Sequence, residues 1–192
     1  MQKFFKALLF LGPFQLFLSV NAQDRTDYII TLKRDTLWGI VNNEHSTHIK
    51  FLGDTAYDYV KIKSTEIKGY KRKKSIYSSE ILPDEFTPVF LQVLRDGKIK
   101  LYEYYKSTGS GVNYSGSYIR RWYVKKDDDP LFEVKSNWGG ASTRKERKEA
   151  FKALIADYKE LGEKWERTEA FDFDTVSAII EEYNNWYRNL NR

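Results

Sequence analysis

The sequence predicts an α+β fold: an N-terminal antiparallel β-sheet or roll built of hairpins, followed by two or three C-terminal helices packed on it. From residue 27 to about residue 134, short β-branched and aromatic segments alternate with turn residues. The chain is 16% aromatic, with 14 Tyr and 5 Trp, and such residues favour the half-buried surface of strands. From residue 143 onward, apolar residues instead recur at helical spacing. Strands first and helices last are typical of a sheet with helices on one face or end.

The first predicted hairpin joins residues 28–33 to residues 36–41 through Arg34-Asp35. This is hairpin spacing, although the turn lacks glycine. Further strands are expected over 48–52, 57–63, 67–78, 118–125 and 131–134. The segment 67–78 contains a strongly polar run at 71–74, and Gly69 is a candidate bulge within it.

The clearest local signal is the pair of segments 89–94 and 99–105 around Asp96-Gly97. Asp-Gly suits the positive φ angles of a type I′ turn. A turn closed there places Leu94 opposite Ile99, and it places Leu91 opposite Tyr102. Because both faces of this hairpin carry apolar residues, we expect it inside the sheet and not at an edge.

Two capping signals define the helical part. Thr143 and Glu146 form a capping box, and Asp172 or Asp174 is the expected N-cap of the last helix. Gly162 is expected to end or break the first helix, so that Leu161 and Trp165 belong to a short second one. The first apolar stripe consists of Phe151, Leu154, Ile155, Tyr158 and Leu161. The last helix is expected to bury Val176, Ile179, Ile180, Tyr183 and either Trp186 or Tyr187.

The first 22 residues have the pattern of a secretory signal peptide. Lys3 and Lys6 precede an apolar run, and Val20-Asn21-Ala22 forms a small-residue cleavage site. The run is short for a membrane span, and no other run of about 18 apolar residues follows it. We therefore expect three parts: a signal peptide at 1–22, a β-rich region at 23–137, and a helical segment at 138–192 that forms one domain with it.

Composition narrows the compartment and the chemistry. Without the leader the chain has 30 basic and 27 acidic residues, a net charge of +3, which is too small for a nucleic-acid-binding balance. The chain has no cysteine, which excludes disulfides, thiolate chemistry and a Cys-anchored lipoprotein. The expected location is the periplasm or the cell surface, with no transmembrane segment in the mature chain.

Several short motifs resemble a family of exported Bacteroidota proteins. The opening Tyr28-Ile29-Ile30-Thr31-Leu32-Lys33, then Asp35-Thr36, Gly39 and Val41, is similar to the family's first hairpin, in which Arg34 replaces the usual glycine. The segments 67–70 and 100–102 resemble two later strands, and Ile179 with the ending Glu182-Tyr183-Asn184 resembles the closing helix. The resemblance implies export and the order of strands before helices, and it implies no catalytic residues.

The functional pattern that we single out is an alternation of aromatic and basic residues. Period two places Tyr118, Arg120 and Trp122 on one face of a strand. Rings beside a guanidinium group are suited to stacking on sugars or binding anionic groups, although core packing with the arginines reaching to solvent explains the same pattern. The run Lys71, Arg72, Lys73 and Lys74 is a second candidate, for contact with an anionic surface. Alternatively, these charges lie on an edge strand and prevent it from pairing with another chain.

The remaining candidates for chemistry are weak. His45 and His48, with Glu44, have a spacing open to metal binding, but a zinc site needs three or four ligands, so a solvated turn is the preferred interpretation. The Gly/Ser-rich loop 107–117 lacks the ending of a phosphate-binding P-loop, and Asp127-Asp128-Asp129 is a strand-ending turn. Glu103 on a central strand is the first candidate acid for a glycosidase, which needs two carboxylates; an exposed rim position is the preferred interpretation.

These observations favour a non-catalytic binding or interaction module of the bacterial envelope, with no cofactor, no metal and no nucleic-acid partner. Its expected partner is an envelope glycan or an envelope protein. One alternative is a carbohydrate-active hydrolase that uses two carboxylates. A second alternative is a structural accessory that docks through its C-terminal helices, which predicts an uncovered apolar patch around Trp165 or Trp186.

Overall fold

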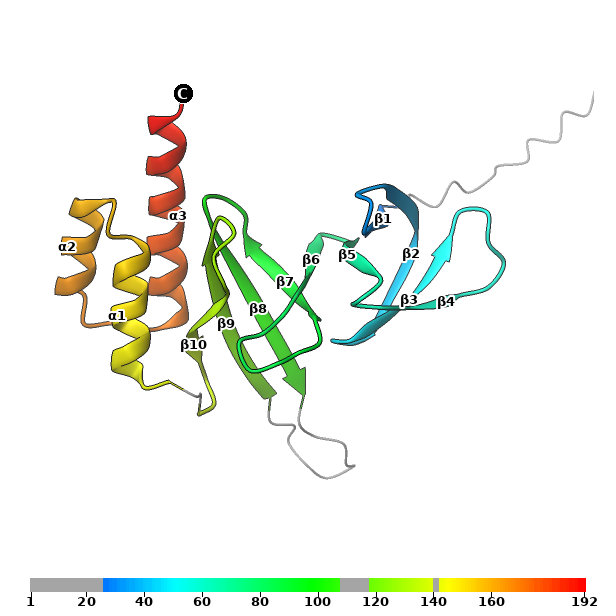
Figure 1. Cartoon of the computed structure of the whole chain (residues 1–192), viewed down its shortest axis with the longest axis horizontal. Helices are drawn as coiled ribbons and strands as arrows, with labels where there is room; N and C mark the ends of the chain where they lie inside the picture. The colour runs from blue at the N-terminus through cyan, green and yellow to red at the C-terminus, as the bar shows by residue number, and fades with distance from the viewer. Residues whose placement is uncertain (1–25, 108–117, 140–141) are drawn as a thin grey trace, which may run out of the picture.

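The computed structural model describes residues 26–107, 118–139 and 142–192. The expected signal peptide and nearly all of the Gly/Ser-rich loop lie outside the described residues. A ten-stranded antiparallel sheet is followed by three helices that pack at one end of it, so the molecule is elongated (Figure 1). The α+β prediction is confirmed.

The sheet is a chain of hairpins. Its strands are β1 (Asp27–Thr31), β2 (Thr36–His45), β3 (His48–Gly53), β4 (Val60–Lys63), β5 (Ile67–Arg72), β6 (Ser75–Glu80), β7 (Val89–Arg95), β8 (Ile99–Ser107), β9 (Tyr118–Lys126) and β10 (Phe132–Ser136). The spatial order is β10-β9-β8-β7-β6-β5-β1-β2-β3-β4. Neighbours in sequence are thus neighbours in the sheet, except that β1 to β3 separate β4 from β5.

The helices are α1 (Arg144–Leu154), α2 (Lys159–Arg167) and α3 (Phe173–Leu190). Both predicted caps are confirmed: Thr143 and Glu146 form the capping box of α1, and the Asp172 side chain accepts a hydrogen bond from the Thr175 N–H at 2.7 Å. The prediction that Gly162 ends or breaks the first helix is wrong. This glycine lies inside α2, and the chain leaves the helix earlier, between residues 155 and 158.

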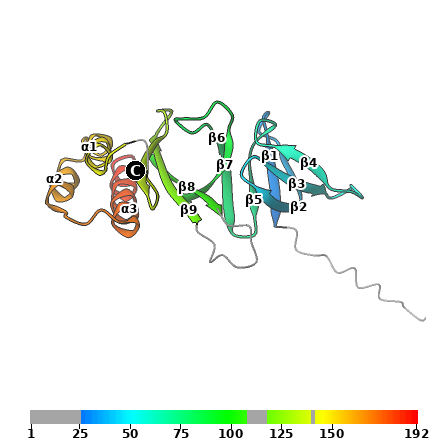
Figure 2. The same cartoon turned by 90° about the horizontal axis from the view of Figure 1, so that it is seen from below.

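Three buried clusters hold the molecule together. The helical core packs β8, β9 and β10 against the helices: Ile99, Leu101, Trp122, Val124, Val134, Phe151, Ile155, Leu161, Trp165, Phe171, Val176, Ile179, Ile180 and Tyr183. The roll core fills the N-terminal half: Ile29, Val41, Ile49, Phe51, Ile67, Tyr70 and Phe90. The rear core lies on the face of β7 to β9 opposite the helical core: Leu82, Val89, Leu91, Tyr102, Tyr123 and Leu131. Figure 2 shows the helices and the N-terminal strands at opposite ends.

The N-terminal strands curl into a roll that closes against β7. The Phe90 N–H on β7 donates to the Ser46 carbonyl in the turn between β2 and β3, at 2.6 Å. The Ser64 hydroxyl, in the turn between β4 and β5, donates to the Pro88 carbonyl at 2.5 Å. Both turns are therefore tied to the strand that continues toward the helices.

The hairpin of β7 and β8 lies inside the sheet as expected, but its predicted turn and register are wrong. Gly97 does not have a positive φ. The strands pair Gln92 with Glu103 and Val93 with Tyr102, with an irregularity after Val93. The glycine is needed for another reason: a Cβ at residue 97 would lie 2.5 Å from the Asn184 Cγ on α3. Close approach of a helix, and not turn conformation, selects glycine here.

Two other strand predictions need correction. The segment 67–78 is two strands, β5 and β6, joined by a turn in which Lys73 has a φ of 54°. β5 lies between β1 and β6, so the basic run does not guard a sheet edge. The expected strand 57–63 shortens to β4, and Tyr57 is fully exposed before it.

Candidate ligand-binding surface

The three residues of the aromatic and basic alternation share one face of β9 but differ in exposure. Trp122 is buried in the helical core, where its ring packs edge-on against Phe173 with 4.8 Å between centroids. Tyr118 is 48% exposed, and the Arg120 side chain is 36% exposed. Trp122 therefore supports the surface from beneath, and the ligand-accessible members of the set are Tyr118 and Arg120.

Glu103 fixes the position of Arg120. Its carboxylate accepts hydrogen bonds from the Arg120 Nε–H and, at 2.8 Å, from the Trp122 indole N–H. The guanidinium carbon also lies 4.5 Å from the ring centroid of Phe173, at the start of α3, which is cation–π geometry. Glu103 is thus largely buried and committed to orienting its neighbours, contrary to the expected exposed rim position.

Two exposed aromatic residues lie near this arginine, at the end of the hairpin of β8 and β9. Tyr105 and Tyr118 stack with 5.5 Å between centroids, and Tyr105 pairs directly with Arg120 across the two strands. We call Tyr105 and Tyr118 the aromatic rim. Trp138, just after β10, is also exposed, at 58%.

Asn137 ties the start of β9 to the residues that follow β10. Its amide oxygen accepts from the Arg120 N–H at 2.7 Å, and its amide nitrogen donates to the Tyr118 carbonyl at 3.0 Å. Its own backbone N–H donates to the Arg120 carbonyl. The start of β9 and the residue before Trp138 are therefore held together by main-chain and side-chain hydrogen bonds, which limits motion of the rim.

The basic run is divided between a strand and a turn. Lys71 and Arg72 end β5, and Lys73 and Lys74 form the turn that follows. The Lys71 ammonium lies 5.9 Å from the ring centroid of Tyr28 on β1. The Lys73 N–H donates to the Asp27 carboxylate at 2.6 Å. This run contributes to folding through these contacts, and within it Lys73 and Lys74 are exposed.

The two histidines face each other at the tip of β2 and β3, with ring centroids 4.5 Å apart. Within the described part of the chain, no group of three or more His, Cys, Asp or Glu side chains could hold a metal ion.

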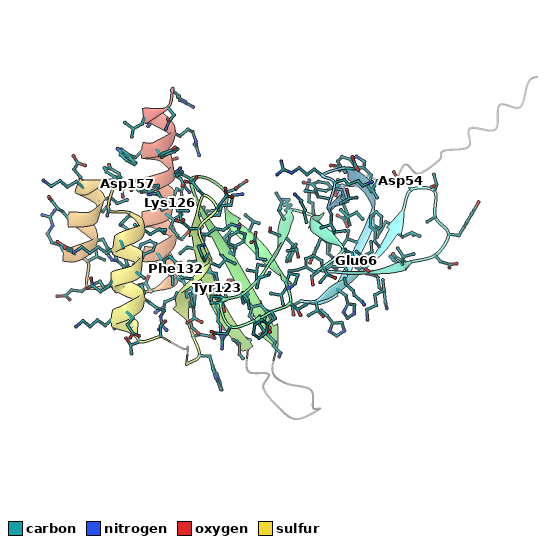
Figure 3. The ribbon with its side chains drawn as sticks, viewed as in Figure 1. Asp54, Glu66, Tyr123, Lys126, Phe132 and Asp157 are labelled. Carbon is teal, nitrogen blue, oxygen red and sulfur yellow. The ribbon has the colours of Figure 1, made fainter. Side chains whose placement is uncertain are left out.

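A cavity of about 280 Å³ lies between α1, β10 and the segment before β7. Figure 3 labels Tyr123 and Phe132, which line it beside α1. Its other lining includes three acidic residues and one arginine: Asp84, Glu133, Glu146 and Arg147. Sequence analysis did not find this cavity, because its walls come from three segments that are distant in the chain.

The acidic residues that line this cavity differ in burial and in their interaction partners. Burial raises the pKa of Glu133, while Arg121 and Arg147 on either side lower it and Asp84 raises it further. Arg147 lies 3.3 Å from the Glu133 carboxylate. Glu146 serves the capping box, where its carboxylate accepts from the Thr143 N–H at 2.6 Å, and Asp84 is exposed. The described lining thus holds one partly buried acid flanked by arginines, and not a buried pair of acids.

The helical face expected to be open is largely covered. Trp165 is fully buried and donates its indole N–H to the Lys148 carbonyl at 3.2 Å. Trp186 is half-buried and stacks on Tyr158 with 4.4 Å between centroids. Among the described residues, the uncovered patch that docking through these helices requires is therefore not found around Trp165.

Sequence analysis missed Tyr105 as a member of the surface and Asn137 as its support. The available signal was Asn137, an amide three residues after the last predicted strand. The pairing of β8 with β9 across a long loop could not be read from spacing alone.

The chain was compared with protein-family models, with curated proteins and with solved structures, and none of the three comparisons gave a match. The fold and the surface described above therefore carry the functional argument. None of the helices in residues 26–107, 118–139 and 142–192 is both long and apolar enough to cross a membrane.

Proposed function

We propose that the protein is a non-catalytic binding module of the bacterial envelope and that its aromatic rim binds a glycan. The observation that carries this proposal is the stacked, exposed pair of Tyr105 and Tyr118 beside an arginine held in place by Glu103. Exposed aromatic faces stack on the apolar faces of sugar rings. The guanidinium group supplies hydrogen-bond donors for hydroxyl or acidic substituents.

Preorganisation supports the same proposal. Arg120 is fixed by a carboxylate and by the ring of Phe173, and Asn137 ties the surrounding main chain together. A surface whose side chains are already held loses less conformational entropy when a ligand binds. The signal-like residues 1–22 support a partner in the envelope.

The test is retention of the protein on isolated peptidoglycan and surface polysaccharide, at low and high salt. The chain from Gln23 onward should be retained saturably, and retention should survive high salt because stacking is not screened. Tyr118→Ala and Tyr105→Ala should each weaken binding by about tenfold, which corresponds to about 1.4 kcal/mol for one ring contact.

Trp38→Ala is the matched control. Trp38 is also 48% exposed and also belongs to an aromatic pair, with Tyr28 at 5.2 Å, but it lies in the N-terminal roll. It should leave retention unchanged. Equal retention of all variants, or retention by neither glycan, would refute the aromatic rim as the binding surface.

The alternative function is a carbohydrate-active hydrolase that uses two carboxylates. The observation that favours it is the cavity beside α1, where Asp84 and Glu133 interact electrostatically and the pKa of Glu133 is raised chiefly by burial. A raised pKa is what a general acid requires. Release of new reducing ends from envelope polysaccharide, abolished by Glu133→Gln and kept by Glu103→Gln, would establish this function in place of the first.

A further inference from the structure

A second, smaller cavity is lined by basic residues and by residues that carry hydroxyl groups. It measures about 180 Å³ and lies where the β3–β4 hairpin meets the segment before β7. Basic side chains come from His48, Lys61 and Lys63, and hydroxyl groups come from Thr47, Thr65 and Thr87. Among the described residues that line it, which also include Ser64, none is acidic and none has a purely apolar side chain.

The register of β3 and β4 brings the basic side chains of this cavity together. His48 is directly opposite Lys63, and Lys61 lies two residues before Lys63 on the same strand. Because alternate residues share a face, these three side chains lie on the same face of the hairpin.

The floor of the cavity is rigid. Ser64 is 2% exposed, and its hydroxyl donates to the Pro88 carbonyl at 2.5 Å. The Ser64 N–H donates to the Thr47 carbonyl at 2.9 Å, and the Ser64 carbonyl accepts from the Ser79 hydroxyl at 2.5 Å. The three segments that carry the threonines are thus fixed relative to one another, so the hydroxyl groups surround a preformed space.

Protection of a sheet edge explains only part of this pattern. β4 is the last strand of the sheet, and lysines on an edge strand hinder pairing with another chain. That role accounts for Lys61 and Lys63 but not for the three threonines that line the cavity with them. The nearby acid Glu66, labelled in Figure 3, directs its carboxylate to the Lys63 backbone N–H at 2.7 Å.

We propose that this cavity binds a phosphate monoester group. Its volume of about 180 Å³ is below the usual range for drug-sized ligands, so it suits a single small anionic group better. Ammonium and hydroxyl groups are the donors that phosphate oxygens accept from. The cavity is lined mainly by residues of the N-terminal strands and their turns. These strands lie at the opposite end of the molecule from the helices (Figure 1), and the proposal does not depend on the glycan surface.

The test is a titration of the folded protein with inorganic phosphate, followed by NMR at physiological ionic strength. The amides of Thr47, Thr65 and Thr87 should shift saturably. The double variant Lys61→Gln/Lys63→Gln should bind phosphate about tenfold more weakly or worse, since each lysine supplies a charge-assisted hydrogen bond. Both lysines are exposed, so the variant should still fold.

The matched control is Lys145→Gln/Lys159→Gln, which makes the same change in net charge at exposed positions on the helices. It should leave phosphate binding unchanged. Thr87→Val, which removes a hydroxyl group and no charge, should weaken binding. If phosphate shifts no amide around the cavity, or if both double variants lose binding equally, the proposal is wrong.

Phosphatidylcholine vesicles with and without phosphatidic acid identify the source of the phosphate. Co-sedimentation that needs phosphatidic acid and is lost in Lys61→Gln/Lys63→Gln would support the site with a lipid headgroup as its ligand. Binding of free phosphate without co-sedimentation would support it with a soluble phosphorylated compound.

Discussion

Arg34 shows how a single residue can carry strain in an otherwise regular hairpin. Its φ of 73° lies in the left-handed region that favours glycine. The turn forces this conformation, because the Arg34 N–H donates to the Thr31 carbonyl and the Thr31 N–H donates to the Asp35 carbonyl, both at 2.9 Å. The hairpin was predicted from its spacing without a glycine, and the structure shows the conformational cost of that absence.

Arg34→Gly should therefore stabilise the protein by about 0.5–1 kcal/mol, because glycine adopts the left-handed conformation without a steric penalty. Thermal unfolding followed by circular dichroism would measure the shift. Lys33→Gly is the control, since Lys33 does not have a positive φ. That variant should lose stability through the greater entropy of its unfolded chain. An equal loss in both variants would contradict the role assigned to Arg34.

The side-chain amide of Asn184, on the last helix, pairs with the main chain of β8 as a neighbouring strand would. Its amide oxygen accepts from the Ile99 N–H and its amide nitrogen donates to the Ile99 carbonyl, each at 2.8 Å. Gly97 provides the space for this side chain, because any larger residue would place its Cβ against the Asn184 amide group. Both an Asp-Gly pair and a Tyr-Asn pair are visible in the sequence. That the glycine and the asparagine are in contact is not.

Asn184→Ala should destabilise the protein by about 2–4 kcal/mol, because it leaves two main-chain groups of Ile99 without partners in a buried environment. Chemical denaturation would measure the loss. Asn185→Ala changes the neighbouring exposed residue and should have an effect of less than about 0.5 kcal/mol. Similar losses in the two variants would show that the hydrogen bonds to Ile99 are not the cause.

At the scale of elements, one acid connects the helices to the sheet. Asp157, between α1 and α2, accepts from the Tyr183 hydroxyl on α3 at 2.7 Å and from the Lys126 ammonium on β9 at 2.8 Å. Figure 3 labels Asp157 and Lys126 where these elements meet. Burial raises the pKa of Asp157, but the hydrogen bonds from Lys126 and Tyr183 outweigh burial and lower it below its ordinary value of 3.8.

The sign of the resulting pH dependence follows from this lowered pKa. A carboxylate whose pKa is lowered in the folded state adds stability at pH values above its ordinary pKa. This stability is lost as the pH falls through the pKa of the folded state. Asp157→Asn should therefore be less stable than the parent near pH 7, by about 0.5–1 kcal/mol for a partly exposed pair. The difference should shrink as the pH falls below 3.8.

Urea unfolding at a series of pH values would follow this difference. Asp128→Asn, in the exposed turn after β9, is the control and should differ little from the parent throughout. A difference for Asp157→Asn that stayed constant down to the lowest pH would mean that the charge of Asp157 is not what stabilises the helices.

Elements were predictable to the extent that their signals are local. Both helix caps and the apolar stripe of the last helix depend on residues within a few positions of one another, and they were found. The first predicted stripe was wrong in its extent, because α1 ends at Leu154 and Leu161 belongs to α2. The Asp-Gly turn failed because a distant helix, and not the local backbone, selects Gly97. Because alternation along one strand is a local signal, the face shared by Tyr118 and Arg120 was predictable. The contribution of Tyr105 depended on a strand pairing that spacing does not reveal.

At the scale of the whole molecule, β7 connects the two ends. Phe90 belongs to the roll core and packs edge-on against Tyr70, with 4.9 Å between centroids. Its neighbours Val89 and Leu91 belong to the rear core, shared with β8 and β9. Because one strand contributes to both clusters, we expect the roll and the helical half to unfold in a single cooperative transition.

Phe90→Ala tests this coupling. It should cost about 3–5 kcal/mol, the usual range for a buried phenylalanine, and it should lower the unfolding midpoint equally at both ends of the molecule. Amide exchange in β2 and in α3 would report the two ends separately. Phe86→Ala, at a fully exposed position in the segment before β7, should change neither. If Phe90→Ala destabilised β2 and left α3 protected, the roll and the helical half would be separate folding units, and the continuous sheet would not couple them.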